Sequence, residues 1–206
     1  MTRRPSPRVF ERLAEAYRAR PGYPEALVQQ LLTLAPLAAR VVDLVQAPAE
    51  STGLPAVSAE LVVLADAAQW VDPEAAGREA FRLLVPGGTA ATVEPRPADT
   101  PFMRDLERLL RQANPERRPQ APGRGRQWLA LASGGGPVRA LEFHHTVELS
   151  APALEAVLRS FSFLGPALGP TRMASLVTDA AELARRAGGA RWERILRLAW
   201  AQKRLA

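Results

Sequence analysis

The chain has no cysteine among its 206 residues. Disulfides, thiol catalysis and cysteine-ligated metal sites are therefore excluded. No apolar run approaches the ~20 residues that a membrane-spanning helix needs. The N-terminal residues 1–5 are basic but are not followed by the apolar core of a signal peptide. We expect a cytoplasmic protein that is not inserted in a membrane.

Lysine is almost missing, because Lys203 is the one lysine among the 27 basic residues and all the others are arginine. Isoleucine and asparagine occur once each, at Ile195 and Asn114. Such usage, with abundant alanine, proline, leucine and arginine, is typical of a GC-rich genome. The net charge of +6 favours attraction to nucleic acid in general. Codon bias nevertheless explains much of the arginine without such a partner.

A glycine-rich turn is missing where a nucleotide-binding α/β domain needs one. Residues 39–44 (ARVVDL) predict a buried strand that ends near an acidic residue, Asp43. The following residues, 45–49 (VQAPA), contain no glycine. A second buried strand is predicted over residues 60–67. The strand is present, but the turn and helix that would hold a phosphate or cofactor are not.

The remaining pattern alternates between helices and strands, which predicts one domain with an open sheet covered by helices. Residues 115–126 are rich in proline, glycine and arginine and predict an exposed loop. Residues 192–204 fit either a helix or a strand. The other expected helices are 7–19, 24–35, 72–84, 99–113, 150–163 and 170–187, with one or two helical turns over 127–132, and the other expected strands are 89–94 and 138–149.

Five segments, in order, resemble the class I S-adenosylmethionine-dependent methyltransferases of the small-molecule type 11 kind. Residues 10–24 (FERLAEAYRARPGYP) resemble the N-terminal helix of that family, and residues 41–44 its first strand. Residues 49–63 resemble the segment that leads into the fourth strand, 65–73 the loop after it, and 81–88 the helix and turn before the fifth strand. The resemblance covers residues 8–95 well and the rest loosely.

This resemblance implies a truncated Rossmann-like methyltransferase fold, with three αβα layers and a reduced, mostly parallel sheet of about five strands. In that reading, residues 7–35 are N-terminal helices, residues 39–95 the reduced Rossmann core, and residues 138–206 the C-terminal strands and helices. Residues 115–126 remain an exposed loop between them.

The departure from the family is a missing block. The family has Gly-x-Gly-x-Gly after its first strand, where glycine lets the backbone turn tightly and approach the cofactor. Here residues 45–50 resemble the end of the third strand, so the loop and the elements that follow it are absent. The first and fourth strands are neighbours in that fold, and residues 45–59 are long enough for a parallel crossover. The first strand then becomes a sheet edge, which predicts a homodimer across it or an N-terminal helix that covers it.

If a cofactor binds at all, the resemblance implies S-adenosylmethionine contacts from Tyr17, Asp43, Glu50, Asp66 and Gln69. Each residue also has a structural interpretation. Tyr17 fits a packed helix face, Asp43 a strand-end acid, and Glu50 a solvated loop carboxylate. Asp66 and Gln69 follow the carboxyl end of a strand, where open α/β sheets bind ligands. No catalytic residue is expected.

No metal site is expected, because His144 and His145 are adjacent on a strand and face opposite sides. The missing loop predicts a methyltransferase-like protein that has lost S-adenosylmethionine binding and has a binding or assembly role. One alternative is an active methyltransferase on a small molecule, with a rebuilt site. A second alternative is a nucleic-acid-binding module that uses the arginines of residues 115–126, although this loop lacks interleaved aromatic residues that stack on bases.

Overall fold

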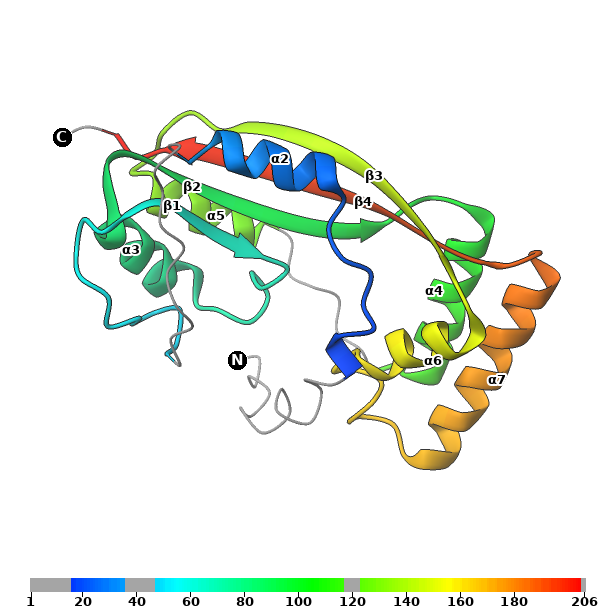
Figure 1. Ribbon diagram of the computed structural model, residues 1–206. Helices are drawn as coiled ribbons and strands as arrows, with labels where there is room; N and C mark the ends of the chain where they lie inside the picture. Colours follow the sequence, from blue (N-terminus) through cyan, green and yellow to red (C-terminus); the bar gives the residue numbers. More distant parts are fainter. Residues whose placement is uncertain (1–15, 36–46, 117–122, 205–206) are drawn as a thin grey trace. The chain divides into compact units, whose positions relative to one another are not determined.

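The computed structural model describes residues 16–35, 47–116 and 123–204, which contain six helices and four strands (Figure 1). The strands form one sheet in the order β1-β2-β4-β3. The helices are α2 (Glu25–Thr33), α3 (Pro73–Leu83), α4 (Pro101–Ala113), α5 (Arg124–Ala132), α6 (Ala151–Arg159) and α7 (Pro170–Arg186), and the strands are β1 (Ala59–Ala65), β2 (Leu84–Pro97), β3 (Arg139–Leu149) and β4 (Ala190–Gln202).

The chain divides into two compact units. The unit called here the helical unit comprises residues 1–22, 97–119 and 144–194, and it contains α4, α6 and α7. The sheet unit comprises residues 23–96, 120–143 and 195–206, and it contains α2, α3, α5, β1 and most of β2. β3 and β4 each supply residues to both units. The expectation of a single domain stays a prediction.

β1 and β2 pair in parallel, with Leu61–Ala65 opposite Thr89–Val93. Earlier in the ladder, β2 advances from Leu84 to Thr89 while β1 advances only from Ala59 to Leu61. The Pro86-Gly87-Gly88 sequence, expected as the turn before a strand at 89–94, therefore lies in a bulge inside a longer strand. Gly87 has φ of 76°, which glycine adopts without steric cost.

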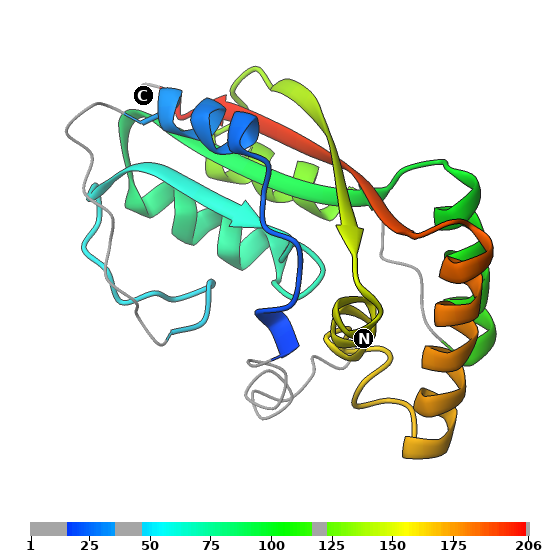
Figure 2. The ribbon, with the colours of Figure 1, turned by 45° about the vertical axis from the view of Figure 1, so that its right-hand side comes forward.

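Helices cover both faces of the sheet in the sheet unit (Figure 2). On one face, Ala90 and Ala199 pack with residues of α3 and α5, including the buried Trp128. On the other face, Leu27 of α2 packs against Ala91 and Leu196. The odd and even residues of β2 thus enter different clusters, as the period of two in a strand requires.

The segment 192–204, which the sequence left ambiguous, is strand β4 from Ala190 to Gln202. β4 lies between β2 and β3 and runs in the opposite direction to β2 (Figure 1). Leu196 and Leu198 are buried on one face, and Ala199 and Ala201 on the other. Burial on both faces removes the alternation that identifies a strand. The sequence pattern therefore did not distinguish a strand from a helix here.

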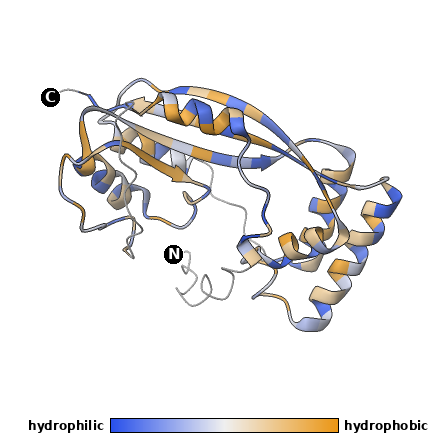
Figure 3. Ribbon diagram, in the orientation of Figure 1, coloured by the Kyte–Doolittle hydropathy of each residue, from blue (hydrophilic) through white to orange (hydrophobic). Residues whose placement is uncertain are grey.

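β3 is the outer strand beyond β4, and its residues alternate between exposed and half-buried from Glu142 onward. The hydropathy colouring in Figure 3 shows the same alternation. The strand predicted over residues 138–149 is therefore confirmed, with β3 beginning at Arg139. An edge position with one covered face explains why this strand, unlike β4, has a clear period of two.

The helical unit has one apolar core. The stripe predicted for α4 contributes Phe102, Leu106 and Leu110, each at most 7% exposed. α6 and α7 contribute the other helical side chains, and Phe161 stacks on Trp192 with ring centroids 6.1 Å apart. The Nδ2 atom of Asn114 donates to the carbonyl oxygen of Phe163 at 2.6 Å, which joins the end of α4 to the segment after α6.

Most other expected helices are confirmed, with changed ends. α6 stops at Arg159 instead of near Phe163, and α5 begins at Arg124, inside the loop expected over residues 115–126. The described residues have four strands where about five were expected. The predicted helix 7–19, except for its end, and the predicted first strand 39–44 lie outside the described residues. No helix within the described ranges is long and apolar enough to cross a membrane.

Candidate functional site

A tight turn connects the carboxyl end of β1 to α3, in the position where open α/β sheets bind ligands. Asp66 follows β1 with φ of 45°, and its backbone N–H donates to the carbonyl oxygen of Val93 at 2.8 Å. The Nε2 atom of Gln69 donates to the Asp66 carbonyl at 3.0 Å. Asp72 then caps α3, because its Oδ1 atom accepts from the N–H groups of Glu74 and Ala75. Asp66 and Gln69 are thus held together by their own turn.

Glu50 is fastened to the same turn. Its Oε1 atom accepts a hydrogen bond from the backbone N–H of Asp72 at 2.8 Å. This carboxylate also lies near the positive end of the α3 dipole, which favours a negative charge. The structure therefore brings three of the five predicted site residues, Glu50, Asp66 and Gln69, to the turn over residues 66–72. Their predicted contacts with a cofactor stay a prediction.

Neither of the other two predicted site residues belongs to the described residues of the sheet unit. Tyr17 belongs to the helical unit, where the guanidinium of Arg20 lies 3.8 Å from the centre of its ring. Arg20 also donates from Nε to the Ser160 hydroxyl and from Nη2 to the Ser160 carbonyl, both at 2.9 Å. Tyr17 is 38% exposed. Asp43 lies outside the described residues.

The strongest polar cluster near the turn centres on Glu79 of α3, which the sequence reasoning missed. Glu79 is 9% exposed. Its Oε1 atom accepts from the Thr52 N–H at 2.9 Å and from the Thr52 hydroxyl at 2.6 Å. Arg82 donates from Nε to Oε2 at 2.7 Å and from Nη2 to Oε1 at 2.8 Å. The spacing of Glu79 and Arg82 along α3 was a visible signal, but their bonds to Thr52 and Leu54 depend on tertiary structure.

These hydrogen bonds hold Glu79 ionised. The Arg82 hydrogen bonds are the largest cause, and together with those from Thr52 they outweigh burial, which acts in the opposite direction. Together, these interactions lower the pKa of Glu79 from 4.5 to about 2. Arg82 in turn donates to the carbonyl oxygen of Leu54 at 2.7 Å. The charged pair thus connects two positions of the preceding segment to α3.

Residues 50–58, which we call the strap, run along α3 to the start of β1. Beyond the contacts of Glu50, Thr52 and Leu54, the N–H of Val57 donates to the Arg82 carbonyl at 3.0 Å. The N–H of Ser58 donates to the Leu83 carbonyl at 2.8 Å. In the family that the sequence resembles, this stretch leads into the fourth strand beside the cofactor. Here the strap is fixed to α3 along its length, and the side chains of Glu50 and Thr52 serve that attachment.

Arg124 is a structural residue of α5, which corrects its assignment to an exposed loop. Its Nε atom donates to the Ala68 carbonyl at 3.2 Å, and its Nη2 atom donates to the Val71 carbonyl. The arginine therefore ties the start of α5 to the turn after β1. Its neighbour Arg126 is exposed. Residues 117–122 of the expected loop lie outside the described residues.

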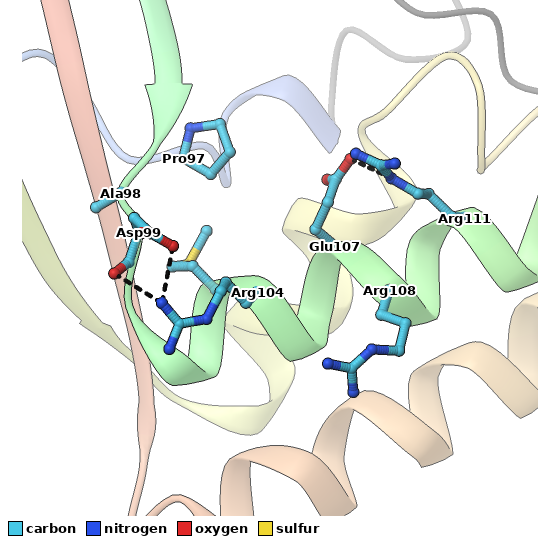
Figure 4. Close-up of a pocket in the computed structure, with 8 residues that line it drawn as sticks. Pro97, Ala98, Asp99, Arg104, Glu107, Arg108 and Arg111 are labelled. Atoms are coloured by element: carbon cyan, nitrogen blue, oxygen red, sulfur yellow. Dashed lines mark hydrogen bonds and ion pairs between the residues drawn. The ribbon is translucent and has the colours of Figure 1, made fainter.

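The helical unit has a groove of ≈ 440 Å³ beside α4 (Figure 4). Arg104 pairs with Asp99, with Nη1 and Oδ1 2.8 Å apart, and Arg111 pairs with Glu107 across 3.3 Å. Arg108, which also lines the groove, pairs with Asp105 at 3.0 Å. Because each arginine has its own carboxylate, the groove presents little net charge to a ligand.

The two adjacent histidines differ in exposure, because His144 is exposed and His145 is half-buried. His145 accepts at Nδ1 from Nη2 of Arg194 at 3.0 Å, since a guanidinium can only donate. Burial, and secondly the charge of Arg194, lowers the pKa of His145 below 6.5. Arg194 also donates to the carbonyl oxygens of Pro21 and Gly22. Within the described ranges, no three histidine, aspartate or glutamate side chains are grouped to hold a metal ion.

The comparisons with known proteins agree with the resemblance. Residues 23–92 match the family model described as a methyltransferase domain. A search of curated proteins found no match. Among solved structures, a proposed type II methyltransferase from Anaeromyxobacter dehalogenans is 22% identical, with a TM-score of 0.53, and the match covers 89% of this chain and 95% of that one.

Two further solved structures match with lower similarity. A proposed methyltransferase from Bacillus halodurans is 16% identical, with a TM-score of 0.49, over 82% of this chain and 74% of its own. The YcgJ protein of a Bacillus species is 16% identical, with a TM-score of 0.45, over 77% of this chain and 69% of its own. The match of residues 23–92 to the methyltransferase-domain model confirms the sequence resemblance, and the fold, with its reduced sheet, is similar to that of the Anaeromyxobacter dehalogenans protein.

Proposed function

We propose that this chain is a methyltransferase-like protein that has lost S-adenosylmethionine binding and has a non-catalytic binding or assembly role. The proposal rests on what occupies the path from residues 39–44 to β1. Over residues 45–58 the sequence has one glycine, Gly53, and one acidic residue, Glu50. A cofactor cradle of this family needs several glycines together and an acidic side chain free to accept from the ligand.

The hydrogen bond of Glu50 carries the argument. Its Oε1 atom accepts from the N–H of Asp72 at 2.8 Å, so turning this carboxylate toward a ligand would leave that N–H, at the start of α3, without this acceptor. The strap that follows is committed to Glu79 and Arg82 through Thr52 and Leu54. The residues present therefore do not fit S-adenosylmethionine as the family binds it, and we derive no methyl-transfer step.

Loss of the cradle also removes the source of catalysis. Methyl transfer requires the methyl group and its acceptor to be held in line, and such positioning is worth about 7–11 kcal/mol in well-oriented reactions. In this family the bound cofactor carries the methyl group that has to be positioned. Without it, the remaining fold serves as a scaffold for another interaction.

One observation favours the alternative, an active enzyme with a rebuilt site. Asp66 has a left-handed φ of 45° at the carboxyl end of β1, and non-glycine residues in such conformations concentrate at functional sites. Aspartate tolerates this conformation better than most residues, so a tight turn accounts for it equally well. Binding of the cofactor separates the two functions.

Isothermal titration of the purified chain with S-adenosylmethionine, and separately with S-adenosylhomocysteine, tests the proposal. We expect no saturable heat at ligand concentrations up to about 1 mM, which corresponds to less than about 4 kcal/mol of binding free energy. Saturable micromolar binding that weakens in Asp66→Ala and Gln69→Ala would overturn the proposal and support the active enzyme. Circular dichroism of both variants checks that a loss of binding is not a loss of fold.

The assembly role that we propose is a homodimer through the strand predicted over residues 39–44. This segment lies outside the described residues, so the support comes from the sequence: a shortened sheet leaves that strand at an edge. Light scattering of the full chain should give twice the monomer mass. A monomer at all concentrations up to about 100 μM, the weak end of specific association, contradicts the homodimer.

A further inference from the structure

The sheet unit contains a pocket of ≈ 240 Å³ that is separate from the turn after β1. α5 supplies Arg126 and Leu129 to its lining, and β4 supplies Arg197 and Ala199. Thr92 of β2 completes this side. These residues lie on the face of the sheet that α3 and α5 cover, at the point where α5 meets β4.

The walls of the pocket are mostly apolar. Leu129 and Ala199 are at most 2% exposed and form its inner surface. Val138 and Ala140, before and within β3, line the outer side, and Val138 is 46% exposed. The volume lies below the 300–1,000 Å³ that holds a drug-sized molecule, so the fitting ligand is small, with a compact apolar body.

Two arginines give this pocket a net positive charge. The Arg126 side chain has no hydrogen bond or ion pair with any part of the chain that the structure describes. Arg197 has one acidic neighbour, Glu94, with Nη1 and Oε2 4.0 Å apart. Two guanidiniums against one carboxylate leave one positive charge. The groove beside α4 differs here, because its Arg104, Arg108 and Arg111 are all paired.

Thr92 supplies a polar group to the inner part of the lining. It is 1% exposed. A hydroxyl can both donate a hydrogen bond to a ligand and accept one from it. The pocket therefore offers a ligand apolar walls, two guanidinium groups and one hydroxyl.

We propose that this pocket binds a small monocarboxylate with a flat or branched apolar body. The carboxylate would lie between the Arg126 and Arg197 guanidiniums, which match it in charge and planar geometry, and the apolar body would contact Leu129 and Ala199. The single net charge favours a monoanion over a phosphate dianion. The pocket does not involve Glu50, Asp66 or Gln69, so the proposal is independent of S-adenosylmethionine binding.

Benzoate is the first probe, with benzamide as its uncharged counterpart and phenyl phosphate as the dianion. Binding is followed by two-dimensional amide NMR of the full chain, which reports both affinity and location. We expect saturable benzoate shifts near residues 126–129 and 197–199, at millimolar or lower concentration. Benzamide and phenyl phosphate should each bind at least about fivefold more weakly, for lack of charge and for excess charge respectively.

Matched arginine variants locate the site. Arg126→Gln should weaken benzoate at least about tenfold, since a charge-assisted hydrogen bond is lost and Arg126 has no structural partner to lose among the described residues. Arg197→Lys keeps the charge beside Glu94 but removes the planar fork, and should weaken binding about threefold to tenfold. Arg108→Gln, in the groove beside α4, should leave benzoate affinity unchanged.

Absence of saturable benzoate shifts would overturn the proposal, as would equal affinity for benzamide. Tighter phenyl phosphate binding would replace the carboxylate by a phosphate ester as the ligand class. Equal weakening by Arg108→Gln and Arg126→Gln would mean that benzoate follows the net charge of the protein rather than this pocket. The fold of each variant is checked by its own amide spectrum.

Discussion

The exposed ion pairs on the helices of the helical unit differ from the Glu79–Arg82 pair of the sheet unit. On the helices of the helical unit, ion pairs such as Arg111–Glu107 and Arg185–Glu182 join residues three or four apart, and the two arginine side chains are 75% and 73% exposed. In the sheet unit, the Glu79–Arg82 pair lies against the strap and holds residues that are 27 and 28 positions away in sequence. The exposed pairs lie on the surface of helices that are already stabilised by an apolar core. The Glu79–Arg82 pair attaches one segment to another.

This difference teaches where the reduced fold is vulnerable. Exposed pairs in water contribute little, because solvent and salt screen them. The Glu79 carboxylate is 9% exposed and accepts four hydrogen bonds. Water cannot take over these hydrogen bonds unless the strap moves. The polar cluster around Glu79 therefore stabilises the attachment of the strap to α3.

The largest effect is expected from Glu79→Gln. The amide keeps the shape but removes the charge, and one of its NH₂ donors faces Arg82 or Thr52. We expect the free energy of unfolding to fall by about 2–3 kcal/mol, measured by urea denaturation. Glu182→Gln in the helical unit is the matched control and should remain within experimental error of the unchanged protein. Equal losses in the two variants would break the contrast between the two kinds of pair.

The loss of stability in Glu79→Gln is expected to depend on pH. The pKa of Glu79 is lowered to about 2 in the folded chain, so its contribution is complete above pH 4.5 and is lost as the pH falls toward 2. The stability difference between the unchanged chain and Glu79→Gln should therefore be larger at pH 7 than at pH 3. A difference that does not change over this range would mean that Glu79 titrates normally.

Gly77→Ala tests how closely α3 and α5 approach in the sheet unit. A Cβ atom at this position would lie 2.7 Å from the Leu131 Cβ and 3.1 Å from the Trp128 carbonyl oxygen. The overlap costs about 1–3 kcal/mol, and the better helix propensity of alanine offsets up to about 1 kcal/mol. We expect a net loss of about 1–2 kcal/mol in urea denaturation.

Gly22→Ala in the helical unit is the control for this overlap. A Cβ atom added to Gly22 would meet no atom within 4 Å beyond its chain neighbours. Its effect should stay within about 0.5 kcal/mol. If the two glycine variants have the same stability, the crossing of α3 and α5 is less tight than the structure indicates.

The variants Arg124→Gln and Arg126→Gln compare two arginines of helix α5. Arg124 holds the start of α5 to the carbonyl oxygens of Ala68 and Val71, whereas Arg126 is exposed and has no partner among the described residues. We expect thermal unfolding to show a loss of about 1 kcal/mol for Arg124→Gln and none for Arg126→Gln. The opposite order would return Arg124 to the solvated loop that the sequence predicted.

The smallest effect concerns His145 of the helical unit. Burial and Arg194 lower its pKa below 6.5, so the folded chain disfavours protonated His145, and stability falls as the pH drops below 6.5. His144→Gln leaves His145 as the one histidine of the chain, and NMR titration should then give a pKa under 6.5. A value at or above 6.5 would mean that Arg194 does not face a neutral ring.

The sequence predicted the helices of both units because their determinants are local. Asp72 and Pro73 start α3, Ser150 caps α6 at the Ala153 N–H, and the apolar stripe of α4 is regular. Strand β3 was equally visible through its alternation. β4 was not, since a strand covered on both faces has no alternation. The bulge at Pro86-Gly87-Gly88 also escaped prediction, because its register depends on the partner strand.

For the candidate site, the sequence determined the family resemblance, the lack of a glycine cradle and the position of Asp66 and Gln69 after a strand. These follow from residue order alone. Only the tertiary structure decided that Glu50 binds the Asp72 amide, that Glu79 holds the strap, and that Arg126 and Arg197 face one pocket. Each of these contacts joins residues more than 20 positions apart, and no local pattern encodes which of many exposed charges will meet once the chain is folded.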